Sequence, residues 1–350
     1  MTSDLDAPLI LAADIGATNS RFALFTANPG PVSAQDSALV LVRERWYKGA
    51  DFNTFTDILQ ALFSPGQDGS TPFLDKYRPP DVAVIAPAGP IVQEDGNAWC
   101  RVSNLPWRID AAQSASAIGT PGVRLINDFA AQALACLLPE AVNAAPVLPG
   151  KAVPGAPLAV TGAGTGFGTA LLVNPGNKPA GSGLDGLLRG DVFIMPGEGG
   201  HAEFPFVGKE EMDFARFAAR EAGTERLIGD AVVSGTGLGL LFTYLTGNRV
   251  HPHDAAAKAP AHPEVMRWYA RFYARACRVY VLQTLALGGL FVTGGMALRV
   301  PVLEHPAFAE ELHASAAQGH LLKQLPVFHV RNPQAGLWGA ALFGLSILPR

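Results

Sequence analysis

The first segment that could do chemistry is a polar turn near the N-terminus, Asp14-Ile15-Gly16-Ala17-Thr18-Asn19, which follows an apolar run. Gly16 can adopt a positive φ and lets the backbone come close to a ligand, while Thr18 and Asn19 add hydroxyl and amide donors. These groups would suit phosphate oxygens held between two strands. Asp14 repels a bare phosphate, so it fits such a ligand only if Mg²⁺ lies between them. A β-turn without function has the same composition, and both interpretations stay open.

Two later glycine-rich segments extend this pattern. Gly162-Ala163-Gly164-Thr165-Gly166-Phe167-Gly168 offers a run of unobstructed backbone N–H groups, which suits an anion. It is not a Walker A loop, and it lacks the third glycine and the following helix of a dinucleotide fingerprint. Thr293-Gly294-Gly295-Met296 follows a buried strand, where the backbone could pass beneath an adenine or a ribose. A glycine-rich hairpin and a plain strand-to-helix turn are the alternatives without function.

Two further segments carry carboxylates. Asn127-Asp128 stands where an apolar strand ends and a helix is predicted to begin, so Asp128 is either a helix N-cap, the simpler interpretation, or a catalytic group. The segment 196–204 places Glu198 and His201 among three glycines, for which a structural reason is hard to find. We expect His201 to be a hydrogen-bonding group rather than a metal ligand, because no second His or Cys lies at ligand spacing.

Alternating strands and helices must position these residues. Strands are predicted at 8–13, 21–26, 38–45, 81–86, 123–126, 158–161, 169–173, 290–293 and 327–331 from apolar runs. Helices are predicted at 52–63, from near 128, and at 210–221, 238–245, 262–287 and 335–345, and an exposed loop at 174–191. Both halves of the chain begin with strand, tight turn and strand. This weak repeat predicts duplicated α/β domains that face each other across a cleft.

The composition limits the class of protein. Of the 350 residues 49% are hydrophobic and 16% are charged, which excludes disorder of the whole chain and allows two domains with their own cores. A net charge of −4 gives no polybasic surface for nucleic acid. The three cysteines are far apart and odd in number, so they form no metal pattern or disulfide framework and fit a reducing cytoplasm.

Neither the N-terminus nor the apolar stretch 279–298 is predicted to enter a membrane. No basic residue precedes Arg21, so the N-terminus is not a secretory signal. Residues 279–298 lack formal charge and are long enough to span a bilayer. They also contain Gln283 and two Gly-Gly pairs, which predicts a buried helix, a turn at Gly288-Gly289 and a buried strand instead.

Together, these motifs make the chain resemble the bacterial glucokinases, in the hexokinase branch of the actin-like ATPase fold. The matching segments, in the family's order, are 14–21 (DIGATNSR), 126–129 (INDF), 162–168 (GAGTGFG), 196–204 (PGEGGHAEF), 234–238 (SGTGL) and 294–296 (GGM). The resemblance reaches from residue 10 to about residue 340. It implies two actin-like, or ribonuclease H-like, α/β domains: a small one of residues 1–138 plus 332–350, and a large one of residues 139–331.

The resemblance also implies roles for individual residues. The ATP phosphates would be held from opposite domains, with Gly294 and Gly295 near the nucleoside. The phosphate residues would be Asp14, Gly16, Ala17, Thr18 and Asn19 from the first turn, and Gly162, Gly164, Thr165 and Gly166 from the second. Asp14 would hold Mg²⁺ through water. Asp128 would be the catalytic base, and the sugar hydroxyls would be bound by Ser103, Asn104, Asn127, Glu198 and His201.

One position departs from the family pattern. The family usually has Glu four residues before its Ser-Gly as a sugar ligand, and here that position is Asp230, before Ser234-Gly235. Spacing favours Asp230 as the ligand, with Glu225 as the alternative. Asp is one methylene shorter than Glu, so we expect weaker discrimination at the C1–C2 edge of the sugar.

The resulting prediction is an ATP- and Mg²⁺-dependent hexose kinase that makes glucose 6-phosphate from glucose, in the cytoplasm and as a homodimer. Another hexose such as mannose or fructose is the alternative substrate, and ADP or polyphosphate the alternative donor. A non-catalytic sugar sensor on the same fold is the rival class. Nucleic acid and membrane are not expected as partners.

Overall fold

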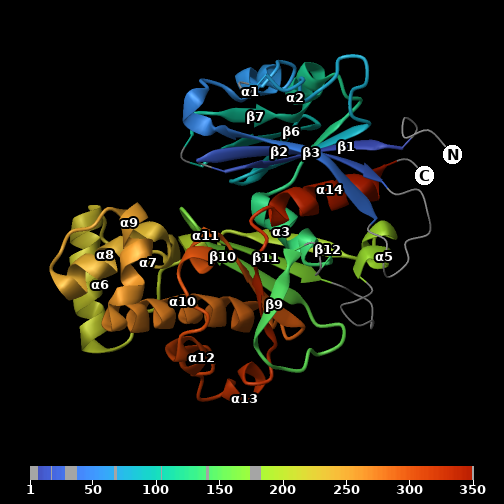
Figure 1. The fold of residues 1–350 in the computed structure, drawn as a ribbon. Helices are drawn as coiled ribbons and strands as arrows, with labels where there is room; N and C mark the ends of the chain where they lie inside the picture. Colours follow the sequence, from blue (N-terminus) through green and yellow to red (C-terminus); the bar gives the residue numbers. More distant parts are fainter. Residues whose placement is uncertain are drawn as a thin grey trace. The chain divides into compact units, whose positions relative to one another are not determined.

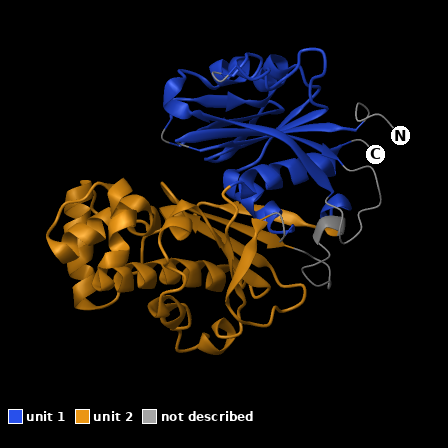
Figure 2. Ribbon diagram, viewed as in Figure 1, with its two compact units in different colours: residues 1–141, 187–190, 334–350 blue, residues 142–186, 191–333 orange. Residues whose placement is uncertain are grey.

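A computed structural model describes residues 7–16, 18–27, 38–66, 69–103, 105–138, 142–173 and 183–348. The chain divides into two compact units, which Figure 2 colours separately. Unit 1 comprises residues 1–141, 187–190 and 334–350, and unit 2 comprises residues 142–186 and 191–333. The predicted boundaries at 138/139 and 331/332 lie close to these divisions, but residues 187–190 were not expected in the first unit. That the units are the small and large domains of a kinase stays a prediction.

Unit 1 is built on a five-stranded sheet with helices against it. Its strands are β1 (Leu9–Ile15), β2 (Asn19–Ala27), β3 (Leu39–Lys48), β4 (Val82–Pro87), β5 (Ile91–Glu94), β6 (Asn97–Arg101), β7 (Arg108–Asp110) and β8 (Val123–Leu125). Its helices are α1 (Phe55–Ala61), α2 (Ala111–Ile118), α3 (Asp128–Ala135) and α14 (Ala335–Ile347). The five-stranded sheet has the order β3-β2-β1-β4-β8, with β4 and β8 parallel to β1, and β5, β6 and β7 form a small antiparallel sheet (Figure 1).

The alternation of side chains on β1 determines which residues reach the helices. Successive side chains on a strand point to opposite faces. Leu11 and Ala13 therefore enter one core cluster with residues of α1 and α2, whereas Ile10 faces α14. There, a Cβ on Gly344 of α14 would lie 2.6 Å from Ile10 Cγ2. Asp14 has the same parity as Ile10, so it lies on the face that α14 covers.

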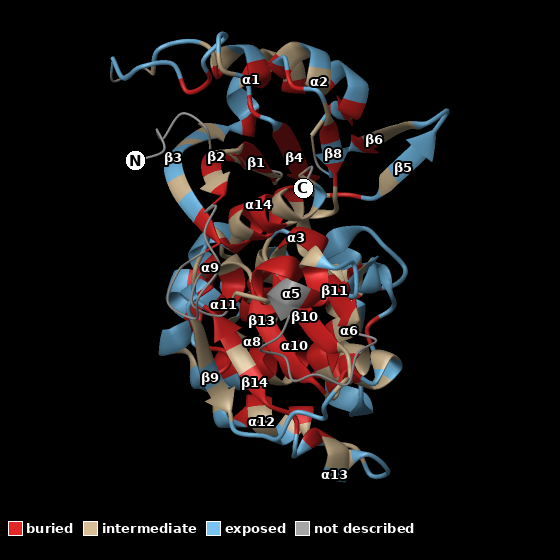
Figure 3. Ribbon diagram, turned by 90° about the vertical axis from the view of Figure 1, so that its right-hand side faces the viewer, coloured by how far each residue is buried: buried red, intermediate tan, exposed pale blue. Residues whose placement is uncertain are grey.

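Unit 2 repeats this plan. Its strands are β9 (Ala144–Leu148), β10 (Leu158–Ala163), β11 (Phe167–Val173), β12 (Phe193–Gly197), β13 (Gly289–Thr293) and β14 (Val327–Val330). Its helices are α6 (Gly208–Ala222), α7 (Gly229–Val233), α8 (Gly235–Thr246), α9 (Pro252–Lys258), α10 (Pro263–Thr284), α11 (Gly295–Arg299), α12 (Pro306–Leu312) and α13 (Gly319–Leu322). The sheet order is β12-β11-β10-β13-β14-β9, an antiparallel meander followed by two strands parallel to β10 and an antiparallel edge strand. Figure 3 shows β10, β13 and α10 buried along most of their lengths. The predicted duplication is therefore confirmed.

The structure differs from the sequence-based expectation at residues 174–191 and agrees with it at residues 279–298. The range 174–191 was predicted to be a loop, but the helix α5 (Gly183–Leu188) lies within it, and residues 174–182 lie outside the described part. The apolar stretch 279–298 divides as predicted, because α10 ends at Thr284 and β13 begins at Gly289. Among the described residues, none of the helices combines the length and the apolar character that crossing a bilayer requires.

A buried ion network joins α6, α10 and α12 in unit 2. Arg275 of α10 is 1% exposed and donates from Nε to Glu311 Oε1 at 2.8 Å and from Nη2 to Glu211 Oε1 at 3.0 Å. Arg271 Nη2 donates to Glu211 Oε1 at 2.8 Å, and Arg278 Nη1 lies 2.9 Å from Glu311 Oε1. Burial raises the pKa of Glu311, but hydrogen bonding and charge from Arg275 outweigh it and hold that pKa below its usual value. Each buried charge thus depends on the others.

Replacing His329 with Leu should flatten the loss of stability between pH 7 and pH 5. His329 on β14 is buried, and neither of its ring nitrogens has a hydrogen-bond partner among the described residues. Burial lowers its pKa, nearby Glu304 opposes this and Arg331 adds to it. The unfolded chain therefore binds the proton more readily, so stability falls as pH drops below about 6.5 toward the lower folded pKa.

Urea denaturation of the wild type and His329→Leu at pH 7, 6 and 5 measures this slope. His320→Leu is the matched control, because His320 is exposed, and it should keep the wild-type pH dependence. If His329→Leu loses stability as steeply as the wild type, buried His329 does not cause the acid sensitivity.

Candidate active site

The candidate residues of unit 1 gather at one edge of its sheet. Parallel strands place their carboxyl ends at the same edge, where open α/β sheets bind ligands. The N–H of Ala88, just after β4, donates to Ile15 O of β1 at 2.9 Å, and Ile126 N–H, just after β8, donates to Ile85 O of β4 at 3.1 Å. The turn 14–19, the loop after β4 and the Asn-Asp pair after β8 are therefore neighbours.

Asp14 is half-buried at this edge, with 16% of its side chain exposed. Burial raises the pKa of its carboxyl group, and the charge and hydrogen bond of Arg21 oppose that rise. Asp14 and Arg21 are directly opposite in the β1–β2 pair, with Nη1 3.4 Å from Oδ2. The first turn of α14 also reaches Asp14, since a Cβ on Gly336 would lie 3.0 Å from its Cγ and Oδ2. The positive end of α14 thus lies beside the carboxylate, which favours its charged form.

Backbone hydrogen bonds hold the first turn. Gly16 N–H donates to Asn19 O at 3.0 Å, and Gly49 N–H donates to Thr18 O at 3.0 Å. Gly16 does not adopt a positive φ, and an added Cβ would make only an ordinary 3.5 Å contact with Asn19 O. The backbone conformation therefore does not require glycine at this position. Ala17 lies outside the described residues.

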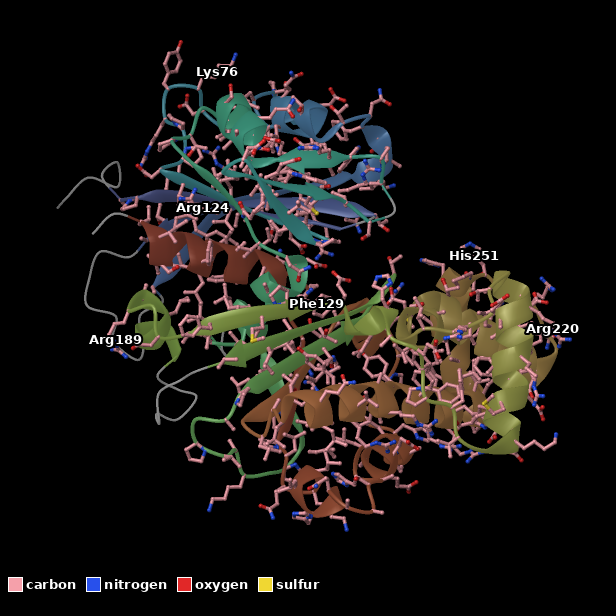
Figure 4. All side chains as sticks on the ribbon, turned by 180° about the vertical axis from the view of Figure 1, so that it is seen from behind. Lys76, Arg124, Phe129, Arg189, Arg220 and His251 are labelled. Atoms are coloured by element: carbon pink, nitrogen blue, oxygen red, sulfur yellow. The ribbon has the colours of Figure 1, made fainter. Side chains whose placement is uncertain are left out.

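The structure decides which residue caps α3. Asn127, not Asp128, is the N-cap: its Oδ1 accepts from Phe129 N at 2.9 Å and from Ala130 N at 3.2 Å, and its Nδ2 donates to Gly89 O at 3.3 Å. The simpler interpretation of Asp128 as the cap was wrong. Asp128 is the first residue of α3 and is half-buried, next to Phe129, which Figure 4 labels on the ribbon. The N–H groups of Phe129 and Ala130 are satisfied by Asn127, so the cap of the helix does not depend on Asp128.

Ser103 joins the same site through the loop after β4. Its N–H donates to Ala88 O at 2.9 Å, and a Cβ on Gly89 would lie 3.7 Å from its Oγ. Since Asn127 donates to Gly89, one loop carries contacts to both Ser103 and the Asn127-Asp128 pair. The side chain of Ser103 is exposed. Asn104 lies outside the described residues.

The second glycine segment is a hairpin turn between β10 and β11 in unit 2. Gly164 N–H donates to Gly166 O at 2.8 Å, and Thr165 at the tip is exposed. A Cβ on Gly164 would meet nothing within 4 Å, so its surface is open. Gly235 N–H, at the start of α8, donates to Gly164 O at 3.2 Å. The positive end of α8 therefore lies beside the turn, an arrangement that favours anions.

The Gly294-Gly295 segment lies beside the base of that turn. Gly162 pairs with Thr293 in the parallel β10–β13 ladder, and a Cβ on Gly162 would lie 2.5 Å from Thr293 O. Gly294 has a φ of +92°, which favours glycine, and a Cβ there would lie 2.6 Å from Ala163 O. Gly295 begins α11. The structure thus brings the second and third glycine segments together, as the sheet order requires.

Glu198 and His201 follow β12 in unit 2. Both side chains are exposed, and Glu198 Oε2 lies 3.5 Å from His201 Nε2. A 3₁₀ turn at Gly199–His201 follows Glu198 and includes His201. The N–H of Gly199 in this turn donates to Thr169 Oγ1 at 3.4 Å. They present adjacent acceptor and donor groups, which suits hydroxyl recognition.

Asp230 and Glu225 lie in different environments. Asp230 Oδ1 accepts from Phe167 N at 2.7 Å, beside the glycine turn. Glu225 is exposed on the loop after α6 and lines a groove of about 880 Å³ with Phe204, Arg220 and Tyr244. Which of the two binds the sugar stays a prediction.

The residues present fit Mg²⁺ and a nucleotide. Mg²⁺ keeps several waters and binds through one or two carboxylates together with substrate phosphates. Asp14 alone meets that need, and the described ranges contain no cluster of three or more His, Cys, Asp or Glu residues that would form a closed protein cage. The open surface of Gly164 and the nearby start of α8 fit a phosphate group.

Some contacts at the site were not predicted from the sequence. Arg21 was part of the matched motif, but its pairing with Asp14 was not expected. Tyr273, deep in α10, accepts the N–H of Ala163 at the base of the glycine turn at 3.1 Å. Gly336 beside Asp14 lies more than 300 residues away in the chain. Only the periodicity of α10 and the small residues of α14 hinted at these positions.

Comparison with known proteins identifies the family. The model of the glucokinase family matches residues 11–346. The glucokinase of Stenotrophomonas maltophilia strain R551-3 is 30% identical, covering 95% of this chain and 94% of that protein. A glucokinase from an Antarctic psychrotroph is similar in structure, with a TM-score of 0.72, 24% identity and coverage of 95% of this chain and 98% of that one. A ROK family glucokinase from Streptomyces griseus, solved with glucose and AMPPNP, has a TM-score of 0.52, 16% identity and coverage of 95% and 98%.

These likenesses agree with the two sheets described above. The predicted fold class, α/β with two actin-like units, is confirmed by the shared fold and by the repeated meander-plus-parallel topology. The match to the family model covers nearly the whole chain. The chain therefore belongs to the glucokinase family.

Proposed function

We propose that this protein is an ATP-dependent glucokinase that transfers the γ-phosphoryl group to the 6-hydroxyl of glucose. The observation that carries the proposal is the position of Asp128. Its neighbour Asn127 provides the cap of α3, so the cap does not depend on the carboxylate of Asp128. Asp128 lies at the same sheet edge as Asp14 and Ser103. A carboxylate at a ligand-binding edge suits a general base.

Phosphoryl transfer depends mainly on the positioning of the reactants and on the stabilisation of charge. Asp128 would accept the proton of the 6-hydroxyl as that oxygen approaches phosphorus. Ser103, Asn104, Asn127, Glu198 and His201 would bind the other hydroxyls, and a sugar that lacks one of these hydroxyls would leave its partner without that hydrogen bond. Such contacts orient the sugar and distinguish it from analogues.

The nucleotide side of the proposal uses the glycine turns. Gly164, Thr165 and Gly166 would hold phosphate oxygens at the positive end of α8, and Gly294 and Gly295 would lie near the nucleoside. Asp14 would hold Mg²⁺ through water, and the chemistry that Mg²⁺ supplies when bound is neutralisation of charge on the phosphate oxygens. A relative solved with glucose and AMPPNP supports both ligands.

A coupled assay of the purified protein across hexoses and donors tests this proposal. The hexoses are glucose, mannose, fructose and 2-deoxyglucose, and the donors are ATP, ADP and polyphosphate, each with and without Mg²⁺. We expect the highest kcat/KM with glucose and ATP and none without Mg²⁺. A preference for another hexose would correct the substrate, and sugar binding without any turnover would identify a sensor.

Two further properties belong to the proposal. We infer a cytoplasmic protein, since the three cysteines are buried and no disulfide joins them among the described residues, which fits a reducing compartment. We also expect a homodimer, which the family resemblance implies. Light scattering coupled to gel filtration would measure the mass directly, and a monomer at micromolar concentration would exclude that state.

A further inference from the structure

Asp230 lies where the glycine turn meets the segment that carries Glu198 and His201. Its Oδ1 accepts the N–H of Phe167, directly after the turn, at 2.7 Å. A Cβ added to Gly166 would lie 2.6 Å from Oδ2, and one added to Gly200 would lie 2.0 Å from Oδ1. The carboxylate therefore packs between two glycines, one from each segment, and neither position leaves room for a side chain.

The stretch of chain that carries Asp230 holds the glycine turn at a second point. Asp230 is in the first turn of α7, and Gly235, five residues later, begins α8. Gly235 N–H donates to Gly164 O at 3.2 Å, while Asp230 accepts from Phe167. Both ends of the turn are thus attached to one short stretch of helical chain.

The segment that carries Glu198 and His201 is attached to the same place through its backbone. A Cβ on Gly200 would lie 2.2 Å from Phe167 O, and Gly229 N–H donates to Ala202 O at 2.9 Å. The side chains of Glu198 and His201 themselves are exposed. Their placement therefore depends on how Gly200 packs against Phe167 and Asp230.

We propose that Asp230 is a positioning residue that holds the glycine turn and the Glu198–His201 segment in one arrangement, and that this is its main role rather than direct binding of a sugar hydroxyl. The inference rests on the proposed function, in which the turn binds ATP and the segment binds the sugar. Loss of the Asp230 acceptor oxygen then weakens the binding of both ligands, each measured alone. A residue that only contacts the sugar affects glucose and leaves the nucleotide unchanged.

Three substitutions separate these roles. Asp230→Ala removes the acceptor for Phe167 N–H. Asp230→Asn keeps an acceptor oxygen of the same reach. Asp230→Glu keeps the charge and restores the residue usual in the family, but its extra methylene carries the carboxylate about 1.5 Å farther, into space that Gly166 and Gly200 leave closed.

Calorimetry on the full-length protein measures the affinity for AMPPNP with Mg²⁺ in the absence of sugar, and for glucose in the absence of nucleotide. We expect Asp230→Ala to weaken both by about tenfold, the effect of losing one hydrogen bond to a charged acceptor. Asp230→Asn should stay within about threefold of the wild type, and Asp230→Glu should weaken AMPPNP binding like the Ala variant. Glu210→Ala, at an exposed carboxylate of α6, is the control and should change neither affinity.

The opposite pattern would overturn the inference. It consists of wild-type AMPPNP affinity in all three variants, weaker glucose binding in the Ala and Asn variants, and wild-type or tighter glucose binding in Asp230→Glu. If Asp230→Ala does not fold, the contrast between the Asn and Glu variants decides the question on AMPPNP alone. Wild-type protein that binds neither ligand would instead overturn the proposed function. That outcome is read from the wild type alone, so it is distinct from any difference between the variants.

Discussion

Asp128→Asn should lower kcat for glucose phosphorylation by roughly 10²–10⁴-fold, the usual contribution of a general base. Asparagine keeps the size of the side chain and one acceptor oxygen, but it takes up no proton at neutral pH. The cap of α3 is Asn127, so the substitution leaves the hydrogen bonds from Phe129 and Ala130 to Asn127 in place. We therefore expect a folded protein with glucose affinity close to that of the wild type.

Turnover in a coupled assay and glucose affinity by calorimetry measure the two effects separately. Asp57→Asn is a matched control in the same unit. Asp57 accepts a hydrogen bond at the start of α1 and belongs to none of the candidate-site segments. It should keep full turnover. An Asp128→Asn enzyme with more than about a third of wild-type turnover would remove Asp128 from the role of base.

Glu211→Leu should lower the free energy of unfolding of unit 2 by about 3–5 kcal/mol, the cost of breaking a buried ion pair from one side. Glu211 is 2% exposed and accepts hydrogen bonds from Arg275, from Arg271 and from the backbone N–H of Val207. Leucine fills similar space but leaves Arg275, 1% exposed, with Glu311 and one backbone carbonyl as its hydrogen-bond partners among the described residues. The guanidinium of Arg275 is shielded from water, and it then lacks the hydrogen bonds to Glu211 that help to offset its lost hydration.

Urea denaturation followed by circular dichroism measures the loss. Glu210→Leu, one residue away on the exposed side of α6, should change stability by no more than about 0.5 kcal/mol. Adding Arg275→Met to Glu211→Leu should restore part of the stability, because the unpaired buried charge is gone. A single Glu211 variant as stable as the Glu210 control would show that the network contributes nothing net.

Local patterns in the sequence were enough to predict the main frame of both units. The strands β1, β2 and β10 were recognised as short apolar runs, and they are buried along most of their length. The long helix α10 was predicted at 262–287, close to its observed bounds. The glycine turns were found for a similar reason, since glycine in such density marks a turn whatever surrounds it. Elements without a strong period were missed, such as β12, whose Phe193 and Met195 are exposed, and the short helix α5.

The sequence by itself therefore determined the class of fold, the order of the glycine segments and the pair Asn127-Asp128 as a candidate for chemistry. Only the tertiary structure decided that Asn127 caps the helix, that Arg21 and Gly336 stand beside Asp14, and that Asp230 packs between Gly166 and Gly200. The physical reason is that these are choices between nearly equal local alternatives or contacts between residues distant in the chain. A cap is selected by the backbone angles of one residue, and a distant contact depends on which strands lie side by side, and neither is encoded in the spacing of neighbouring residues.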